Sequence, residues 1–346
     1  MVATSEAHLP ATRTTHALAW WRPVALVALL ALAVAFVSLA SPTRHPSRER
    51  AAVFPAALSQ HLAAPTFADG SAPGGYAQPA DAGQLDGLTF VLDTGNNRIL
   101  GQDQSGAVLR VIGGPSEGQP SLQRPMALAT DGRCLYVANT GASQVLVLEP
   151  DGSIVKTVDL PPAASDGRAA RPVGLAVRPD GGLVVTDPDN NRVLFFGNDG
   201  QLQTTLGGSR AAGSSGFNAP GGVAVDGAGF VYVVDILNGR VVKLSQDGGF
   251  LRQFGHPGDT AGTFSRPKDV AVDSSGNVYV SDGILAAIQV FNAEGDYLGF
   301  IGRTDPGDAR SRSLFVAPAG LTVAGDTLYV MDRFAGLFAF RLQNQN

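Results

Sequence analysis

The sequence predicts an all-β fold, a six-bladed β-propeller, from three observations: a strand pattern recurs six times, the copies are evenly spaced, and each copy contains four strands. The copies share a Tyr-Val-x-Asp element that ends at Asp93, Asn139, Asp187, Asp235, Asp282 and Asp332. The intervals between these residues are 46, 48, 48, 47 and 50. Four short antiparallel strands repeated at about this interval are typical of a propeller blade rather than a solenoid coil.

Each copy divides into four expected strands. In every copy except the first, the innermost strand begins with Pro and continues with small and β-branched residues, as at 220–225, which suits the crowded centre of a radial sheet. The second is the Tyr-Val-x-Asp element. The third is exemplified by 192–196, and the fourth ends in Gly, as at 251–255. Turns that contain Gly and Asp join the strands, as expected for hairpins.

Ring closure can also be predicted. The last copy ends after its third strand, at 337–342, whereas the segment before the first copy resembles the end of a unit. We therefore expect residues 62–67 to supply the outer strand of the last blade and so remove an unpaired edge. Five residues three positions before the blade prolines are expected to fill the gaps between blades as core: Tyr76, Leu122, Phe217, Phe264 and Phe315.

The N-terminal part predicts a membrane anchor. We divide the chain into a polar leader (1–16), a transmembrane signal-anchor helix (17–40), a tether (41–60) and the propeller (61–346). The stretch 23–40 carries no charge, and as a helix it would reach roughly 27 Å. Trp20 and Trp21 precede it, where indole rings favour the membrane interface. The alternative is a cleaved signal peptide, because small residues stand at 38–40.

The charges that flank the apolar stretch do not decide on which side of the membrane the propeller lies. Arg13 and Arg22 precede the apolar stretch, and Arg44, Arg48 and Arg50 follow it, so the positive-inside count slightly opposes export. We still expect an extracytoplasmic propeller on a single-pass anchor, because a lone N-terminal apolar helix before a large domain usually acts as a signal-anchor.

Composition excludes several classes of function. The single cysteine, Cys134, excludes a disulfide framework and a cysteine-rich zinc module. From residue 61 onward the chain has 20 Lys and Arg against 28 Asp and Glu, a net charge of −8. This balance opposes binding of nucleic acid.

The repeats resemble the NHL-repeat family of six-bladed propellers. The resemblance depends on Pro-x-Gly-Val-Ala-Val-Asp, Gly-x-Val-Tyr-Val-x-Asp and Asp-x-x-Asn-x-Arg-Val, which are most complete at 220–241 and partial at 187–193. It covers roughly residues 62–342. The resemblance implies the fold strongly and the function weakly, since one fold hosts unrelated activities.

The recurring acid is interpreted as structural. In three copies Arg follows Asp by five residues, which places both at the base of one hairpin, where Asp can accept turn N–H groups and pair with Arg. These pairs are Asp93 with Arg98, Asp187 with Arg192, and Asp235 with Arg240.

A catalytic centre is not predicted. Amidating lyases of similar fold use several histidines on zinc, but only His61 and His256 lie at or beyond the start of the propeller. Lactonase-like propellers ring calcium with Glu, Asp and Asn, whereas Asp269 is the one acid identified at the starts of the inner strands, beside Met126, Gly174, Gly222 and Gly320. We assign no catalytic residue, metal or cofactor, and keep a metal-dependent lactonase-like or lyase-like enzyme as the alternative.

Surface recognition is the function that the sequence favours. In copies four to six, apolar residues replace the polar turn on one face, and they predict an exposed patch for a protein or peptide partner. The alternative is that these side chains fold back over neighbouring blades. The candidate partner-binding residues are Ile236, Leu237, Lys268, Asp269, Asp282, Ile284, Leu285, Arg333 and Phe334. The sequence thus predicts a non-catalytic recognition or scaffolding module.

Overall fold

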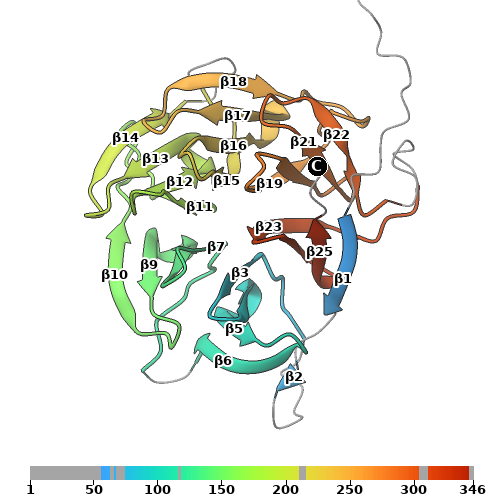
Figure 1. The fold of residues 1–346 in the computed structure, drawn as a ribbon. Coiled ribbons are helices and arrows are strands. Elements are labelled where there is room, and N and C mark those ends of the chain that lie inside the picture. The colour runs from blue at the N-terminus through green and yellow to red at the C-terminus, as the bar shows by residue number, and fades with distance from the viewer. Residues whose placement is uncertain are drawn as a thin grey trace, which may run out of the picture. The chain divides into compact units, whose positions relative to one another are not determined.

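Six sheets are arranged radially around a central axis (Figure 1). The computed structural model describes the strands at 56–62 and 66–67, and residues 75–115, 118–209, 216–303 and 311–342. The predicted six-bladed all-β propeller is confirmed. The predicted membrane helix at 17–40 lies outside the described residues, and within them no helix is long and apolar enough to cross a membrane.

Each blade is a sheet whose strands follow one another outward from the axis. Blade 1 contains β3 (Asp81–Leu85), β4 (Leu88–Asp93), β5 (Arg98–Gln102) and β6 (Ala107–Gly113), and blade 2 contains β7 (Ala127–Thr130), β8 (Leu135–Asn139), β9 (Gln144–Leu148) and β10 (Ile154–Asp159). Blade 3 contains β11 (Gly174–Val177), β12 (Leu183–Asp187), β13 (Arg192–Phe196) and β14 (Leu202–Gly207).

The second half of the ring repeats this order. Blade 4 contains β15 (Pro220–Val225), β16 (Val231–Asp235), β17 (Arg240–Leu244) and β18 (Phe250–Phe254), and blade 5 contains β19 (Pro267–Val272), β20 (Val278–Asp282), β21 (Ala287–Phe291) and β22 (Tyr297–Ile301). Blade 6 contains β23 (Pro318–Ala324), β24 (Thr327–Asp332) and β25 (Gly336–Leu342). Short 3-10 turns join the second and third strands of blades 1 to 4: η1 (Thr94–Asn96), η2 (Thr140–Ala142), η3 (Pro188–Asn190) and η4 (Ile236–Asn238).

An N-terminal strand closes the ring, as predicted, but its position differs. β1 (Ala56–Leu62) pairs antiparallel with β25 and becomes the outer strand of blade 6. It therefore begins within the expected tether, and the expected closing segment 62–67 overlaps it only at Leu62. β2 (Thr66–Phe67) instead pairs in parallel with β6 of blade 1. The N-terminal segment thus contributes strands to both blades at the junction.

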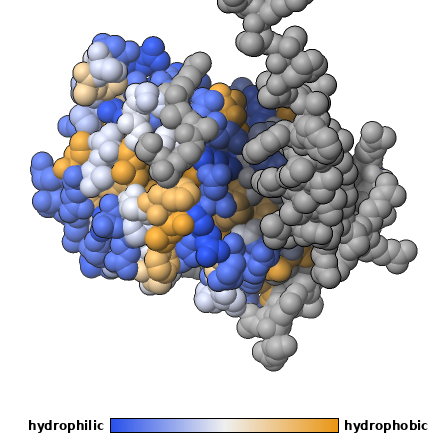
Figure 2. Space-filling view, turned by 90° about the horizontal axis from the view of Figure 1, so that it is seen from above, coloured by the Kyte–Doolittle hydropathy of each residue, from blue (hydrophilic) through white to orange (hydrophobic). Residues whose placement is uncertain are grey.

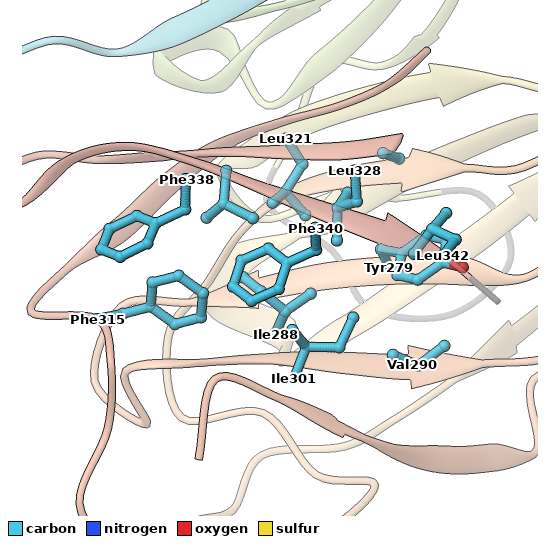
Figure 3. Packing of buried hydrophobic residues seen from close by; sticks show 12 residues of the cluster. Tyr279, Ile288, Val290, Ile301, Phe315, Leu321, Leu328, Phe338, Phe340 and Leu342 are labelled. Carbon is cyan, nitrogen blue, oxygen red and sulfur yellow. The ribbon is translucent and has the colours of Figure 1, made fainter. Parts of the chain in front are cut away.

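The core lies between neighbouring sheets rather than within any one of them. The largest cluster joins blades 5 and 6 and is drawn in Figure 3. Phe315 precedes β23 and packs against Phe338 and Phe340, with ring centroids 5.1 and 5.8 Å away. Leu122, Phe217, Phe264 and Phe315 are all buried, and Tyr76 is partly buried against another cluster, so these residues do fill the gaps between blades.

The outer edges of the blades are mainly polar. Figure 2, turned by a right angle from Figure 1, shows hydrophilic side chains over most of the visible rim, with separate apolar patches between them. Apolar residues more than a third exposed on outer strands include Leu109, Ile154, Val155, Leu202 and Leu251.

Candidate ligand site at the mouth of the central channel

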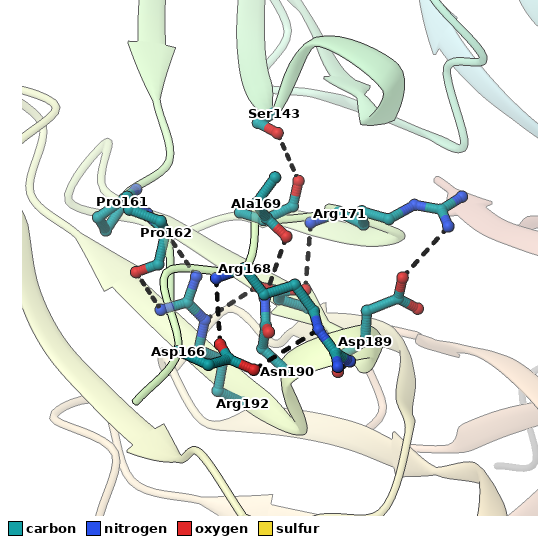
Figure 4. Close-up of polar contacts among 12 residues, drawn as sticks. Ser143, Pro161, Pro162, Asp166, Arg168, Ala169, Arg171, Asp189, Asn190 and Arg192 are labelled. Carbon is teal, nitrogen blue, oxygen red and sulfur yellow. Dashed lines mark hydrogen bonds and ion pairs between the residues drawn. The ribbon is translucent and has the colours of Figure 1, made fainter. Parts of the chain in front are cut away.

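The turns of blades 1, 3 and 4 are held by buried ion pairs. The predicted pairs form with Nε–Oδ2 distances of 2.8 Å for Arg98 and Asp93, 2.9 Å for Arg192 and Asp187, and 2.8 Å for Arg240 and Asp235. In blade 3, Arg192 also donates to the Pro161 and Pro162 carbonyls (Figure 4). Arg240 likewise donates to the Gly216 carbonyl of the preceding loop, and also to Gln253 of the outer strand of its blade. These contacts are made within the blade and its loops, which is a structural role.

The turns of blades 5 and 6 are built differently. Asp282 accepts hydrogen bonds from the backbone N–H groups of Ser265, Arg266, Ile284 and Leu285. Asp332 accepts from the N–H groups of Val316, Ala317, Phe334 and Ala335. Because backbone donors satisfy these acids, the turn side chains need not be polar.

A cavity of about 800 Å³ follows the six inner strands along the axis and opens among these turns. Six of the nine predicted partner-binding residues line it: Ile236, Lys268, Asp269, Ile284, Arg333 and Phe334. Ile284 is 61% exposed and Phe334 is 73% exposed. The channel mouth therefore combines charged and apolar side chains from blades 4, 5 and 6.

Three predicted contact residues do not belong to this site. Leu285 is buried and packs with Ala287 and Phe300, so its assignment to the surface was wrong. Asp282 is fully buried and satisfied by backbone donors, so it offers no polar contact. Leu237 is 63% exposed but does not line the cavity.

Ile236 follows the alternative expectation, in which the apolar turn side chains fold back over the neighbouring blades. This residue is half-buried and packs against the core between blades 4 and 5. Its Cδ1 would lie 2.7 Å from a Cβ added at Gly221, so the glycine provides the space for this packing. Ile284 and Phe334 are therefore the exposed apolar residues of the mouth.

Two carboxyl groups lie deeper in the channel, at Asp81 of blade 1 and Asp269 of blade 5. Each accepts an N–H from the next residue and one from the inner strand of the following blade. Ala82 N–H lies 2.8 Å and Leu128 N–H 2.9 Å from the Asp81 oxygens. The Asp269 oxygens accept from Val270 at 2.9 Å and Leu321 at 2.8 Å. Each acid thus ties its blade to the next.

Burial alters the protonation of both acids. It raises the pKa of Asp81 well above the ordinary value, and the charge of Asp269 adds to this shift. Burial also raises the pKa of Asp269, to about 7. A Cβ at Gly320, in the blade between them, would lie 2.6 Å from Asp81 Oδ1, and one at Gly222 would collide with the Asp269 carboxyl. Glycine in these neighbouring blades leaves the space that the acids occupy.

Asp81 was missed in the sequence, although a signal for it exists. The first copy lacks the Val-Ala-Val pattern of an inner strand, so the expected inner strands began with the second copy. Pro79 nevertheless corresponds to Pro267, and two residues further on Asp81 corresponds to Asp269. Counting from the proline would have found the second acid.

The acid pair does not fit a calcium ion of the kind found in lactonase-like propellers. Ca²⁺ takes six to eight oxygen ligands. All four oxygens of Asp81 and Asp269 already accept backbone N–H groups, and burial favours the protonated forms. No group of three or more His, Cys, Asp or Glu that could hold a metal occurs among the described residues.

The other potential nucleophile and base lie away from the channel. Cys134 is half-buried just before β8, and burial raises the pKa of its thiol, which disfavours the reactive thiolate. His256 is exposed in the segment after β18 and does not line the cavity.

Fold and channel define the class of this protein as a six-bladed β-propeller with an axial cavity. No protein-family model and no curated protein matches the chain. Among solved structures it is similar to a catalytically inactive virginiamycin B lyase from Staphylococcus aureus with quinupristin, at 15% identity and a TM-score of 0.56, covering 80% of this chain and 86% of the lyase. It is also similar to a Xanthomonas campestris gluconolactonase, at 19% identity and a TM-score of 0.55, covering 85% and 97%.

A third similar structure is a protein of unknown function from Bacteroides thetaiotaomicron, at 13% identity and a TM-score of 0.62, covering 79% of this chain and 72% of that protein. At these identities the likeness shows the fold alone, and any function must be argued from the site.

Proposed function

We propose that this chain is a non-catalytic recognition module that binds a protein or peptide partner with the face carrying the channel mouth. In this proposal the segment 17–40 tethers the propeller to a membrane, with the propeller outside the cytoplasm. The observation that carries the proposal is the convergence of exposed Ile284 and Phe334 with Lys268 and Arg333 on a single cavity. Exposed apolar side chains beside charged groups are typical of recognition surfaces.

Paired substitutions at the mouth test this function. Ile284→Asp with Phe334→Asp should leave folding intact, because both side chains are mostly exposed. It should reduce partner capture from crosslinked intact membranes at least tenfold, since it puts charge where apolar contact is proposed. Ile154→Asp with Leu251→Asp is the matched control, because both side chains are exposed on the outer strands β10 and β18 and neither lines the cavity. Equal capture by the two variants would contradict the proposal.

An enzyme is the second candidate, and the pair of acids in the channel, Asp81 and Asp269, is the observation that favours it. Carboxyl groups with raised pKa values in a cavity are able to serve as general acid and base. Two of the similar structures are named as a lyase and a gluconolactonase. Turnover of gluconolactone or quinupristin by the purified protein, abolished by Asp269→Asn, would replace recognition with catalysis.

A further inference from the structure

Three cationic side chains gather on one side of the channel mouth. Arg266 directly precedes β19, Lys268 belongs to β19, and Arg333 directly follows β24 of the next blade. All three line the cavity. Burial lowers the pKa of the Lys268 ammonium, and the charges of Arg266 and Arg333 lower it further. The mouth is therefore a region of concentrated positive charge in a chain whose net charge is negative.

This positive charge has no carboxylate partner among the described residues. None of the seven ion pairs found there includes Arg266, Lys268 or Arg333. Asp282 attracts Lys268 electrostatically, but both of its oxygens already accept backbone N–H groups. Asp269 also lines the cavity, where backbone N–H groups occupy both of its carboxyl oxygens. The cluster is thus positioned to bind an anion from outside the chain.

The Arg124 side chain adds a fourth cation from blade 2. It is exposed and lines the same cavity. Like the other three, it joins none of the ion pairs in the described part of the chain. Cations around the wall of one cavity concentrate an anionic ligand at its entrance.

Apolar surface lies directly beside the cations. Ile284 follows Gly283, and a Cβ at Gly283 would lie 3.6 Å from the Lys268 Cε, so the lysine stem runs beside this turn. Phe334 is the neighbour of Arg333 and is 73% exposed. Farther along the channel the wall is lined by Val177, Val225, Val272 and Val323. The mouth is therefore amphipathic, with charge and apolar area within one ligand's reach.

We propose that the channel mouth binds an organic anion carried on an apolar body, with its anionic group between Arg266, Lys268 and Arg333 and its apolar part against Ile284 and Phe334. The inference rests on the proposed function and names the chemistry of its ligand. A cavity of about 800 Å³ is in the size range of small-molecule sites. A free organic acid and the terminal carboxylate of a peptide present the same chemistry, and the experiment distinguishes them.

Two fluorescent probes that differ in charge test the inference on the full chain. Anilinonaphthalene sulfonate is anionic, and N-phenyl-1-naphthylamine is its uncharged analogue. We expect the anion to bind at least tenfold more tightly than the neutral probe, and Lys268→Gln or Arg333→Gln to weaken only the anion, by about three- to tenfold. Lys156→Gln is the control, because Lys156 donates to the Asn198 carbonyl on the outer part of the blades.

The outcomes separate this inference from the proposed function. Equal binding of the two probes, unchanged by Lys268→Gln, would overturn the anion site. If Phe334→Asp still weakened both probes in that case, recognition at the mouth would stand. If Phe334→Asp changed neither probe, both the anion site and recognition at the mouth would fail.

Competition identifies the source of the anion. Displacement of the sulfonate probe by phenylbutyrate supports a free organic acid, and displacement by acetyl-Leu-Phe but not by its carboxamide supports a chain end. Displacement by neither acid, or equal displacement by the carboxamide, would overturn the proposal.

Lysine modification gives a second readout that needs no substitution. The chain has three lysines, Lys156, Lys243 and Lys268, and only Lys268 lines the axial cavity. The sulfonate probe should slow acetylation of Lys268 at least threefold while Lys156 and Lys243 react at unchanged rates, as measured by mass spectrometry of their peptides. Equal slowing of all three, or of none, would contradict binding at the mouth.

Discussion

The turns of blades 3 and 6 place the same strand-end acid in two different surroundings. Asp187 of blade 3 accepts from the side chains of Asn190 and Arg192, whose polar groups close the turn. Asp332 of blade 6 accepts from backbone N–H groups only, and the turn presents Arg333 and Phe334 to the channel mouth. Both turns keep the strand-end acid. Only the turn in which backbone N–H groups satisfy that acid leaves its side chains available for a ligand.

The largest predicted effect comes from removing the acid that faces a buried cation. Asp187→Ala leaves Arg192, whose side chain is 6% exposed, without its carboxylate, and should cost about 3–5 kcal/mol in the free energy of unfolding. Asp332→Ala removes the carboxylate that accepts backbone N–H groups but strands no cation, so we expect a loss of about 1–3 kcal/mol. Urea unfolding of both variants measures the difference.

A double variant checks the cause of this loss. Asp187→Ala with Arg192→Met removes the stranded charge and should recover at least about 1 kcal/mol relative to Asp187→Ala alone. Equal losses for the blade 3 and blade 6 single variants, with no recovery in the double variant, would show that the two kinds of turn are energetically alike.

The blade count, the spacing and the ion-paired turns could be predicted because they repeat. Positions that depart from the repeat were harder to predict. The outer strand β1 has no motif, so closure was expected near 62–67 rather than at Ala56–Leu62. Leu285 was expected at the surface, because an Ile-Leu pair in a turn does not reveal which side chain packs inward. Asp81 lies in the least regular copy, so the second channel acid was overlooked.

A smaller effect on stability is expected from a change of pH. It arises on the side of the ring where blades 5, 6 and 1 meet. The pKa of Asp269 is raised to about 7 in the folded state, so folding favours its protonated form. This contribution to stability is complete below about pH 4 and is lost as pH rises toward about 8. We expect the free energy of unfolding to fall by about 2–3 kcal/mol between pH 5 and pH 8 through this group.

The slope of stability against pH, rather than its absolute value, is the measurement for Asp269. Asp269→Asn should flatten the slope, although the amide gives up one acceptor for a backbone N–H. Asp103→Asn is the control, because hydrogen bonding to Ser105 lowers the pKa of Asp103, so it titrates below this range. A variant slope equal to that of the unmodified protein would show that Asp269 is ionised throughout.

The smallest predicted effect is a gain in stability at the blade 5 turn. The fourth residue after the strand-end Asp, or after Asn139 in blade 2, has a positive φ in all six blades: Asn97, Ser143, Asn191, Gly239, Ala286 and Gly336. Ala286, with φ 49°, is the one with neither a polar side chain nor the freedom of glycine. For an L-residue whose side chain makes no hydrogen bond, this conformation costs about 1 kcal/mol of conformational free energy. Ala286→Gly should therefore raise the free energy of unfolding by about 0.5–1 kcal/mol, measured by urea unfolding.

The blade 1 turn provides the matched comparison for that gain. Asn97 is left-handed too, with φ 52°, but its Oδ1 accepts the Arg124 N–H from the next blade at 2.7 Å. Asn97→Gly relieves the same backbone strain and loses this bond, so it should give no gain or a loss of about 1 kcal/mol. If both glycine variants were equally stabilised, backbone strain alone would govern the two turns. The difference between polar and apolar turns would then lie only in what their side chains offer a ligand.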